Sequence, residues 1–254
     1  MNNKLEAMQE LLEVMDKLLG PGGCPWDREQ THQTLTRYLI EESYEVIEAI
    51  QEENMIKLQE ELGDVLLQVV FHAALAEKEG TFDFSDVALT IAHKMISRHP
   101  HVFADMDLKT SDDVMAHWEG FKKAEGKKHL LDGIPAMLPA LMRAEKIQEK
   151  AARVGFDWPV IDGVLDKVRE EIDELAEATG NEVEEELGDL LFAIVNLARF
   201  KAIDPEKALQ AANDKFCRRF RYVEDKINDS GFQLSQSSLQ EMDKYWDEAK
   251  SKGY

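Results

Sequence analysis

The segment at residues 170–200 decides the fold of this chain. It reads E-E-I-D-E at 170–174, T-G-N at 179–181, and E-V-E-E-E-L-G-D-L-L-F-A-I-V-N-L-A-R-F at 182–200. Helical spacing on both sides of the T-G-N break predicts two helices joined by a short turn. Glu171 and Glu174 are spaced i, i+3, as are Glu186 and Asp189, so each pair shares one helix face. We therefore expect four carboxylates to face one another across a helical hairpin.

Nearly the same sequence occurs earlier in the chain. E-E-S-Y-E stands at 41–45, and E-E-L-G-D-V-L-L-Q-V-V-F stands at 60–71. Each acidic block is followed by a lysine and an arginine spaced i, i+4, and then by a tryptophan. The matching residues of the first copy are Glu42, Glu45, Glu61, Asp64, Lys94, Arg98 and Trp118. Those of the second copy are Glu171, Glu174, Glu186, Asp189, Lys215, Arg219 and Trp246. This recurrence in one order indicates a tandem repeat.

Helical spacing runs through the whole chain, and no convincing alternating strand pattern interrupts it. We predict helices at 3–19, 31–53, 55–78 with Asn54 as cap, 83–98, 112–124, 137–154, 161–178, 182–200, 205–227 and 235–250. C-P-W-D at 24–27 and G-F-D-W-P at 155–159 are expected to be loops. The predicted fold class is all-α, with two related helical bundles in tandem. We place the first domain at 1–130, a connector at 131–159 and the second domain at 160–254.

The composition argues against several classes of function. The chain has 254 residues, with 51 acidic and 30 basic side chains and a formal charge of −21. That balance repels nucleic acid, and the local basic patch that duplex binding needs is not found. The first residues lack a signal-peptide core, and the longest apolar runs are too short for a membrane span. Cys24 and Cys217 lack disulfide or zinc spacing, so we expect reduced thiols in a cytoplasmic protein.

The acidic residues that open the 182–200 helix have two explanations. Glutamates in a first helical turn complement the helix dipole, and Asn181 as the cap accounts for the three of that turn. This explanation does not cover Glu186 and Asp189. The helix becomes apolar almost all round after them, and such a helix is predicted to be buried. Carboxylates at the entry to a buried helix need a compensating cation.

The residue types select the chemistry of the site. Acidic pairs without histidine or cysteine form an all-oxygen site, which favours Mg²⁺ first and Mn²⁺ second. Lysine and arginine one helical turn apart can hold phosphate oxygens, and a tryptophan can stack on a nucleobase. A solvated basic face and core packing are the alternatives for these residues. Gly63 and Gly188, inside E-L-G-D in both copies, indicate close approach by a ligand or by another helix.

The motifs together resemble the MazG family of nucleoside triphosphate pyrophosphohydrolases. The resemblance rests on E-E-x-x-E followed by E-x-x-D, on C-P-W-D-R-E-Q-T-H at 24–32, and on L-L-D-G-I-P at 130–135. It covers nearly the whole chain and fits the two-domain members. It implies the all-α NTP pyrophosphohydrolase fold, and conversion of an NTP and water to an NMP and pyrophosphate with Mg²⁺. It also implies a homodimer with broad nucleotide preference and a role in nucleotide-pool housekeeping or regulation.

The resemblance also assigns roles to residues. The metal ligands would be Glu171, Glu174, Glu186 and Asp189. The nucleotide contacts would be Lys167, Glu170, Glu171, Glu185, Lys215, Arg219 and Trp246. Glu170 or Glu171 would accept the proton of the attacking water, while Lys215 and Arg219 would stabilise charge on the phosphates. The second repeat would be the catalytic one, and the matching residues of the first would form a second candidate site.

An interpretation from a different class stays open at this point. The acidic faces could belong to a non-catalytic helical module that binds nucleotide or partner proteins as a regulator. Such a docking face gives no reason for the matched lysine, arginine and tryptophan. Release of pyrophosphate that is lost with EDTA separates the enzyme from the regulator.

Overall fold

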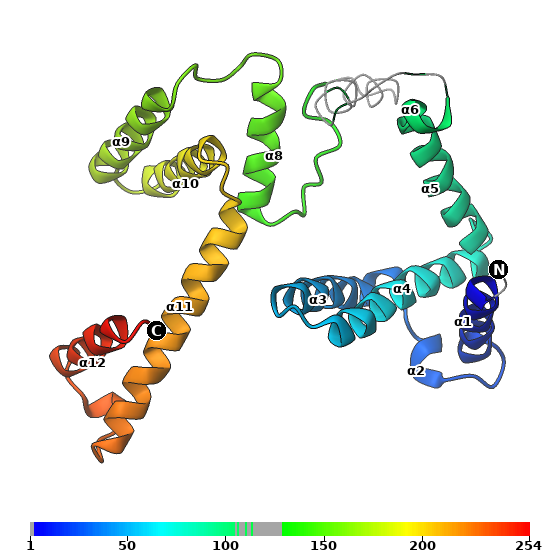
Figure 1. Ribbon diagram of the computed structural model, residues 1–254, viewed down its shortest axis with the longest axis horizontal. Coiled ribbons are helices and arrows are strands. Elements are labelled where there is room, and N and C mark those ends of the chain that lie inside the picture. The colour runs from blue at the N-terminus through cyan, green and yellow to red at the C-terminus, as the bar shows by residue number, and fades with distance from the viewer. Residues whose placement is uncertain (1–2, 105, 107–109, 111–112, 114–128) are drawn as a thin grey trace. The chain divides into compact units, whose positions relative to one another are not determined.

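The computed structural model describes residues 3–104, 106, 110, 113 and 129–254. Within these residues the regular structure is entirely helical (Figure 1), which confirms the predicted all-α class. Contacts between residues divide the chain into two units, 1–123 and 124–254. Each unit is built around one helical hairpin that carries acidic residues on both helices. The helix predicted at 112–124 lies, apart from residue 113, outside the described residues.

The first unit places its core at one end of its hairpin. Helices α3 and α4 lie side by side (Figure 1), and α1 and α5 both contact α4. The core residues are Met15, Leu19, Leu35, Val70 and Phe71. This core holds the start of α3 against the second half of α4. The elements of the unit are α1 (Asn3–Leu19), α2 (Pro25–Arg28), α3 (His32–Gln51), α4 (Met55–Lys78), α5 (Phe84–Arg98) and α6 (Pro100–Phe103).

Local signals set where these helices begin. The Asn54 side chain accepts a hydrogen bond from the Lys57 backbone N–H at 3.1 Å, so Asn54 caps α4 as predicted. Thr31 and Asp83 form capping boxes at α3 and α5. The C-P-W-D stretch differs from the prediction, because it contains the helical turn α2 and not a loop. Proline suits the first position of a helix, where its missing N–H costs nothing, and α6 begins with proline too.

The second unit contains two helix pairs. Helices α9 and α10 form the hairpin that the sequence predicts, and α8 packs against α10. Helix α11 follows α10 and pairs with α12 (Figure 1). The stretch expected as a connector, 131–159, lies inside this unit, since α8 contacts α10 and α11. The elements are α8 (Ala140–Ala152), α9 (Ile161–Glu177), α10 (Glu182–Phe200), α11 (Pro205–Asp229), the 3₁₀ turn η1 (Leu234–Gln236) and α12 (Leu239–Ser251).

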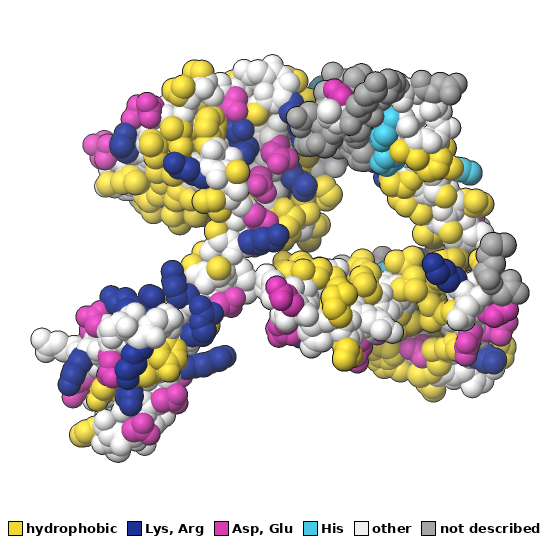
Figure 2. Space-filling model, viewed as in Figure 1, with side chains coloured by type: hydrophobic (Ala, Val, Ile, Leu, Met, Phe, Trp, Pro, Cys, Tyr) yellow, Lys and Arg dark blue, Asp and Glu magenta, His cyan; other side chains and the backbone are white. Residues whose placement is uncertain are grey.

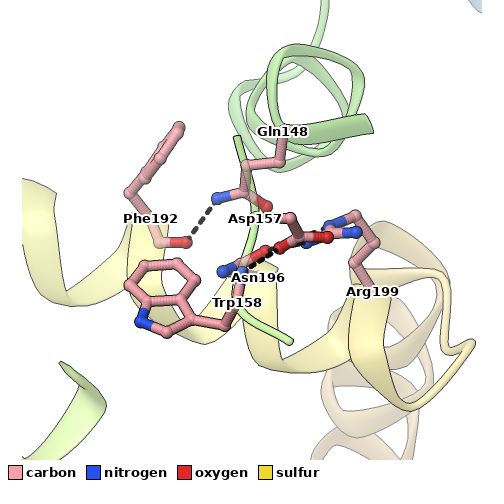
Figure 3. Close-up of polar contacts among 6 residues, drawn as sticks. All are labelled: Gln148, Asp157, Trp158, Phe192, Asn196 and Arg199. Atoms are coloured by element: carbon pink, nitrogen blue, oxygen red, sulfur yellow. Dashed lines mark hydrogen bonds and ion pairs between the residues drawn. The ribbon is translucent and has the colours of Figure 1, made fainter. Parts of the chain in front are cut away.

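A polar clasp, made of Gln148, Asp157, Asn196 and Arg199, fastens α10 to its neighbours (Figure 3). Gln148 Nε2 donates to the backbone carbonyl of Phe192 at 2.8 Å. Arg199 Nη2 donates to Asp157 Oδ1 at 2.6 Å and to Asn196 Oδ1 at 2.8 Å. Gln148 and Asn196 are 7% and 6% exposed. The neutral Gln148 bond fixes α10 relative to α8. The Arg199–Asp157 bond joins charged groups, of the kind that contributes about 1.5–3 kcal/mol, and fixes α10 to the loop before α9.

Trp158, next to Asp157 of the clasp, packs against the start of α9. Its indole ring lies so close to the start of α9 that a Cβ atom at Gly163 would clash with it. Glycine is therefore required at this position. The G-F-D-W-P loop thus supplies Asp157 to the clasp on α10 and Trp158 to the contact with α9, so one short loop ties the hairpin together.

One prediction about α10 is wrong. The apolar run after Asp189 predicts a buried helix, but Leu187, Leu191 and Ile194 are 46%, 47% and 45% exposed. Figure 2 shows hydrophobic side chains gathered over this part of the second unit. Helices α8 and α9 pack against only part of α10, and no described residue of the unit covers the rest. A contiguous exposed apolar face of this kind marks an interaction surface.

Candidate active site

Three carboxylates converge at the α9–α10 hairpin. Glu171 comes from α9, while Glu186 and Asp189 come from the first half of α10. Each offers an oxygen, and these oxygens all lie within 4.8 Å of one another. We call these residues the second trio. Glu171 is 4% exposed, whereas Asp189 is open to solvent. Glu174, the fourth carboxylate of the predicted set, lies outside the trio.

Lys167 lies beside the trio, one turn before Glu171 on α9. Its Nζ atom lies 2.8 Å from Glu170 Oε1 and 2.7 Å from Glu171 Oε1. The hydrogen bond to Glu170, followed by that to Glu171, raises the pKa of Lys167 above its usual range. The second oxygen of Glu171, Oε2, is buried and has no hydrogen-bond partner among the described residues. Buried polar atoms are nearly always paired, so this oxygen fits a ligand to a cation.

The chain alone does not balance the charge of the trio. Burial raises the pKa of Glu186, and the carboxylates of Glu174, Glu171 and Asp189 raise it further. A bound cation would act in the opposite direction, because positive charge favours the ionised form of Glu186. The donors are all oxygen atoms, so the trio suits a hard cation such as Mg²⁺ better than zinc.

The first turn of α10 corrects the prediction about its cap. Asn181 has helical backbone angles and makes no side-chain capping bond. A carboxylate oxygen of Glu182 instead accepts from the Thr179 backbone N–H at 3.4 Å. The glutamates of this turn are therefore explained by the helix dipole and not by a capping asparagine. Glu185, a predicted nucleotide contact, is exposed here next to Glu186.

Gly63 and Gly188 do not serve helix packing inside the chain. A Cβ atom at either position would meet no heavy atom within 4 Å among the described residues. Glycine costs a helix about 1 kcal/mol relative to alanine. Of the explanations that the sequence leaves open, close approach by another helix of the same chain finds no support, so a ligand or a second copy of the chain is favoured.

The first hairpin carries a matching cluster of Glu42, Glu45 and Glu61, here called the first trio. Burial raises the pKa of Glu42 and of Glu61, and neighbouring carboxylates, including Asp64, add to the effect. Asp64 itself lies outside the first trio although its counterpart Asp189 belongs to the second. Glu45 belongs to the first trio although its counterpart Glu174 lies outside the second. Each predicted set of four carboxylates is thus brought together as three.

The two trios differ in the basic side chains that lie beside them. The position that corresponds to Lys167 is Tyr38, whose ring and hydroxyl group contact Arg37. In the described part of the chain, no ion pair reaches the first trio. Lys94 and Arg98 lie on α5, and Trp118 lies outside the described residues.

The predicted phosphate and base contacts of the second repeat lie on the other helix pair. Lys215 and Arg219 are on α11, and Trp246 is on α12. Lysine and arginine side chains gather over these two helices in Figure 2. Across the described residues, α9 has no contact with α11 or α12. A single chain therefore does not join all parts of the predicted site.

Trp246 lines an apolar groove of about 230 Å³ between α11 and α12. Its ring centre lies 5.0 Å from that of Phe216, and the Arg219 guanidinium carbon lies 5.8 Å from the Trp246 ring centre. The other apolar residues of the groove are Phe220, Val223, Leu239 and Met242. Trp246 is half-buried, so it packs against α11 and still offers ring surface to the groove.

Comparison with protein families gives the identity of the fold. A family model described as the MazG nucleotide pyrophosphohydrolase domain matches residues 30–103 and 161–223. The chain belongs to the MazG family. The two matched segments contain the two trios, so the MazG resemblance inferred from the acidic motifs is confirmed.

Two relatives within the MazG family are similar over almost their full length. The nucleoside triphosphate pyrophosphohydrolase/pyrophosphatase MazG of Thermotoga maritima is 49% identical, with 95% of each chain covered. The nucleoside triphosphate pyrophosphohydrolase of Escherichia coli K12 is 48% identical, with 97% of this chain and 98% of the relative covered. A solved structure of a MazG-related protein from Thermotoga maritima aligns with 45% of this chain and 98% of its own, at 28% identity and a TM-score of 0.40.

Several residues around the MazG site were not predicted. Phe216 packs against the Trp246 ring at a tilt of 52° and stacks on Phe220, and its signal was its spacing of four from Phe220. Asn196 of the clasp could have been noticed as a polar residue inside the apolar run of α10. The bond from Arg219 to Tyr254 has no signal in the sequence. Cys24 and Cys217 are free thiols. No helix in the described residues is long and apolar enough to cross a membrane.

Proposed function

We propose that this MazG protein is an Mg²⁺-dependent nucleoside triphosphate pyrophosphohydrolase, which converts an NTP and water to an NMP and pyrophosphate. The observation that carries the proposal is the second trio, with Lys167 on one side of Glu171 and an unpartnered buried oxygen on the other. The names of the Thermotoga maritima and Escherichia coli relatives support this reaction. Mn²⁺ is the expected substitute metal.

The residues of the α9–α10 hairpin are proposed to have separate roles in hydrolysis. Mg²⁺ held by Glu171, Glu186 and Asp189 would neutralise the triphosphate and lower the pKa of a bound water. Lys167 orients Glu171 through a contact of 2.7 Å. Glu170, which is exposed and bonded to Lys167 at 2.8 Å, would accept the proton that the attacking water loses.

The nucleotide is proposed to bind through the basic and aromatic residues of α11 and α12. Lys215 and Arg219 lie one helical turn apart and would stabilise charge on the phosphates. Trp246 would stack on the base, and stacking tolerates any base because each has a π-face. We therefore propose broad NTP and dNTP preference, in a cytoplasmic protein that acts on the nucleotide pool.

A homodimer is proposed to cover the exposed face of α10. Leu187, Leu191 and Ile194 lie on this face, and the open space at Gly188 would admit a closely packed second copy. Leu191→Glu should convert the dimer to a monomer, as measured by light scattering after size exclusion. Val14→Glu, at a comparably exposed apolar residue of α1, should leave the dimer intact. A monomeric wild-type protein would contradict the proposal.

The activity is tested by release of pyrophosphate from the common NTPs. The wild-type protein should form NMP and pyrophosphate with Mg²⁺ and neither product with EDTA. Glu186→Gln and Asp189→Asn should each abolish turnover while circular dichroism stays helical. Wild-type activity in either variant would move the site away from the second trio. Absence of product from every NTP, with no gain in thermal stability from Mg²⁺, would favour the non-catalytic regulator.

A further inference from the structure

The turn that follows α12 holds Arg219 by one atom. Arg219 Nε donates to the backbone carbonyl oxygen of Tyr254 at 2.9 Å. Nε carries one N–H, whereas the two Nη atoms carry four. The bond therefore uses the N–H nearest the side-chain stem and leaves the outer edge of the guanidinium, which can bind a phosphate with two parallel hydrogen bonds.

The backbone of this turn is set by glycine. Gly253 has a φ of +83°, in the left-handed region that favours glycine. The Gly253 N–H bonds to the Lys250 carbonyl at 3.2 Å, and the Tyr254 N–H bonds to the Ala249 carbonyl at 3.2 Å. This pair of bonds is the Schellman motif that ends many helices. It turns the chain so that the Tyr254 carbonyl faces α11.

The side chains of the turn are fastened to α11 as well. The Tyr254 ring centre lies 5.0 Å from that of Tyr222, which is 8% exposed. The Tyr222 hydroxyl donates to Glu248 Oε1 at 2.8 Å and accepts from Lys252 Nζ at 2.6 Å. Lys252 also pairs with Glu248 at 2.7 Å. This network locks the turn against a buried tyrosine.

The two attachment points lie on one face of α11. Tyr222 follows Arg219 by three residues, and residues three apart on a helix are neighbours on its surface. The turn therefore contacts α11 at two points: the Tyr254 ring packs against Tyr222, and the Tyr254 carbonyl accepts the hydrogen bond from Arg219. Among the described residues, the other contact of Arg219 is with the Trp246 ring. The guanidinium is thus held at its Nε atom and next to the aromatic groove.

We propose that the turn of Lys252, Gly253 and Tyr254 is a positioning element that orients Arg219 for the triphosphate. This inference rests on the proposed function, in which Arg219 binds phosphate. A long side chain that is ordered before binding loses less conformational freedom when the substrate arrives. The turn acts through Arg219 alone, so Lys215, one turn earlier on α11, does not depend on it.

A double-mutant cycle tests the inference. Truncation after Lys252 removes the Tyr254 carbonyl and ring, and should raise the KM for Mg·ATP by about three- to tenfold, the cost of ordering one long side chain. The kcat should change less than the KM. In an Arg219→Lys background the same truncation should have no further effect, because lysine has no Nε–H of this kind. An equal rise in KM in both backgrounds would show a merely structural role and overturn the inference.

Point variants keep the test decisive if the truncated chain is unstable. Tyr254→Phe preserves the ring and should behave as wild type, since the Tyr254 hydroxyl makes no hydrogen bond with the described residues. Tyr254→Ala should raise the KM. Gly253→Val should raise it too, because valine rarely adopts the left-handed φ. Wild-type KM in both Tyr254→Ala and Gly253→Val would refute the positioning role.

Binding of Mg·ATP by calorimetry separates failure of the inference from failure of the proposed function. If the wild-type protein binds ATP but releases no pyrophosphate, the proposed hydrolysis fails. The ratio of Kd values between the truncated and the wild-type protein then still tests whether the turn positions Arg219. If turnover is normal and truncation changes neither KM nor Kd, the inference fails and the hydrolase stands. If the wild-type protein does not bind ATP, both fail.

Discussion

Lys167 Nζ lies 2.7 Å from Glu171 Oε1, and Glu171 is the most buried carboxylate of the second trio. The lysine places positive charge beside a side chain that is only 4% exposed. The first trio has Tyr38 at the corresponding position and no such charge. Because a buried carboxylate needs a partner, Lys167 stabilises the ionised Glu171 and fixes its orientation in the metal-free protein.

Lys167→Met should lower the stability of the metal-free protein by about 1 kcal/mol, a small cost because Lys167 is partly exposed. Mg²⁺ should then raise the melting temperature more in the variant than in the wild type, since nothing else offsets the Glu171 charge. Thermal unfolding with EDTA and with Mg²⁺ measures both effects. Arg169→Met, which breaks an exposed pair with Asp166 on the same helix, is the control. Equal Mg²⁺ shifts in the Lys167 variant and the wild type would count against this role.

The two hairpins should differ in activity. Glu186→Gln should reduce pyrophosphate release by about two orders of magnitude or more, the scale for losing one group that stabilises transition-state charge. Glu61→Gln, at the matching position of α4, should retain most of the activity, because no lysine in the described part of the chain pairs with the first trio. One assay with both variants under the same conditions measures this. The reverse order of activities would place the working site in the first repeat.

The clasp should contribute measurably to stability. Asp157→Asn removes the charge opposite Arg199, in a pair whose side chains are 22% and 18% exposed. We expect a loss of about 1–3 kcal/mol in the free energy of unfolding, as for hydrogen bonds to charged groups. Asp166→Asn, in a pair that is 73% and 69% exposed, should change it little. Urea denaturation of the two variants measures these losses. Similar losses in both variants would contradict a specific contribution of the clasp to stability.

Two histidines of the first unit should make its stability depend on pH. His32 Nδ1 and His72 Nδ1 lie 2.7 Å apart, and their rings stack with centres 5.0 Å apart. Burial lowers the pKa of His72 below 6.5, and His32 lowers it further. The unfolded chain therefore binds a proton more readily than the folded one, so stability present above pH 6.5 is lost as the pH falls through 6.5 toward the lowered pKa.

His72→Gln should flatten this pH dependence. The comparison is the urea midpoint of the variant and the wild type at pH values about one unit above and below the usual histidine pKa. His93→Gln, at an exposed position on α5, should keep the wild-type slope. An unchanged slope in the His72 variant would assign the pH effect to other groups.

Much of the fold follows from local patterns in the sequence. The 3.6-residue period predicts most helices, and polar residues such as Asn54 predict where helices begin, because capping involves only neighbouring residues. The acidic spacing likewise places Glu186 and Asp189 on one face of α10. The short turns α2 and α6 were missed because helices of four residues have no period to detect.

The arrangement of the site depends on contacts between residues far apart in the chain. The spacing i, i+3 puts Glu171 and Glu174 on one face of α9, but the packing of α9 on α10 brings only Glu171 into the trio. An apolar run cannot reveal which neighbour covers it, so α10 is predicted to be buried although much of its apolar face is exposed. The bond between Arg219 and Tyr254 joins residues 35 positions apart. Local spacing determines helices and their faces, whereas long-range packing selects which side chains meet, because it depends on how the helices cross and where the chain turns back.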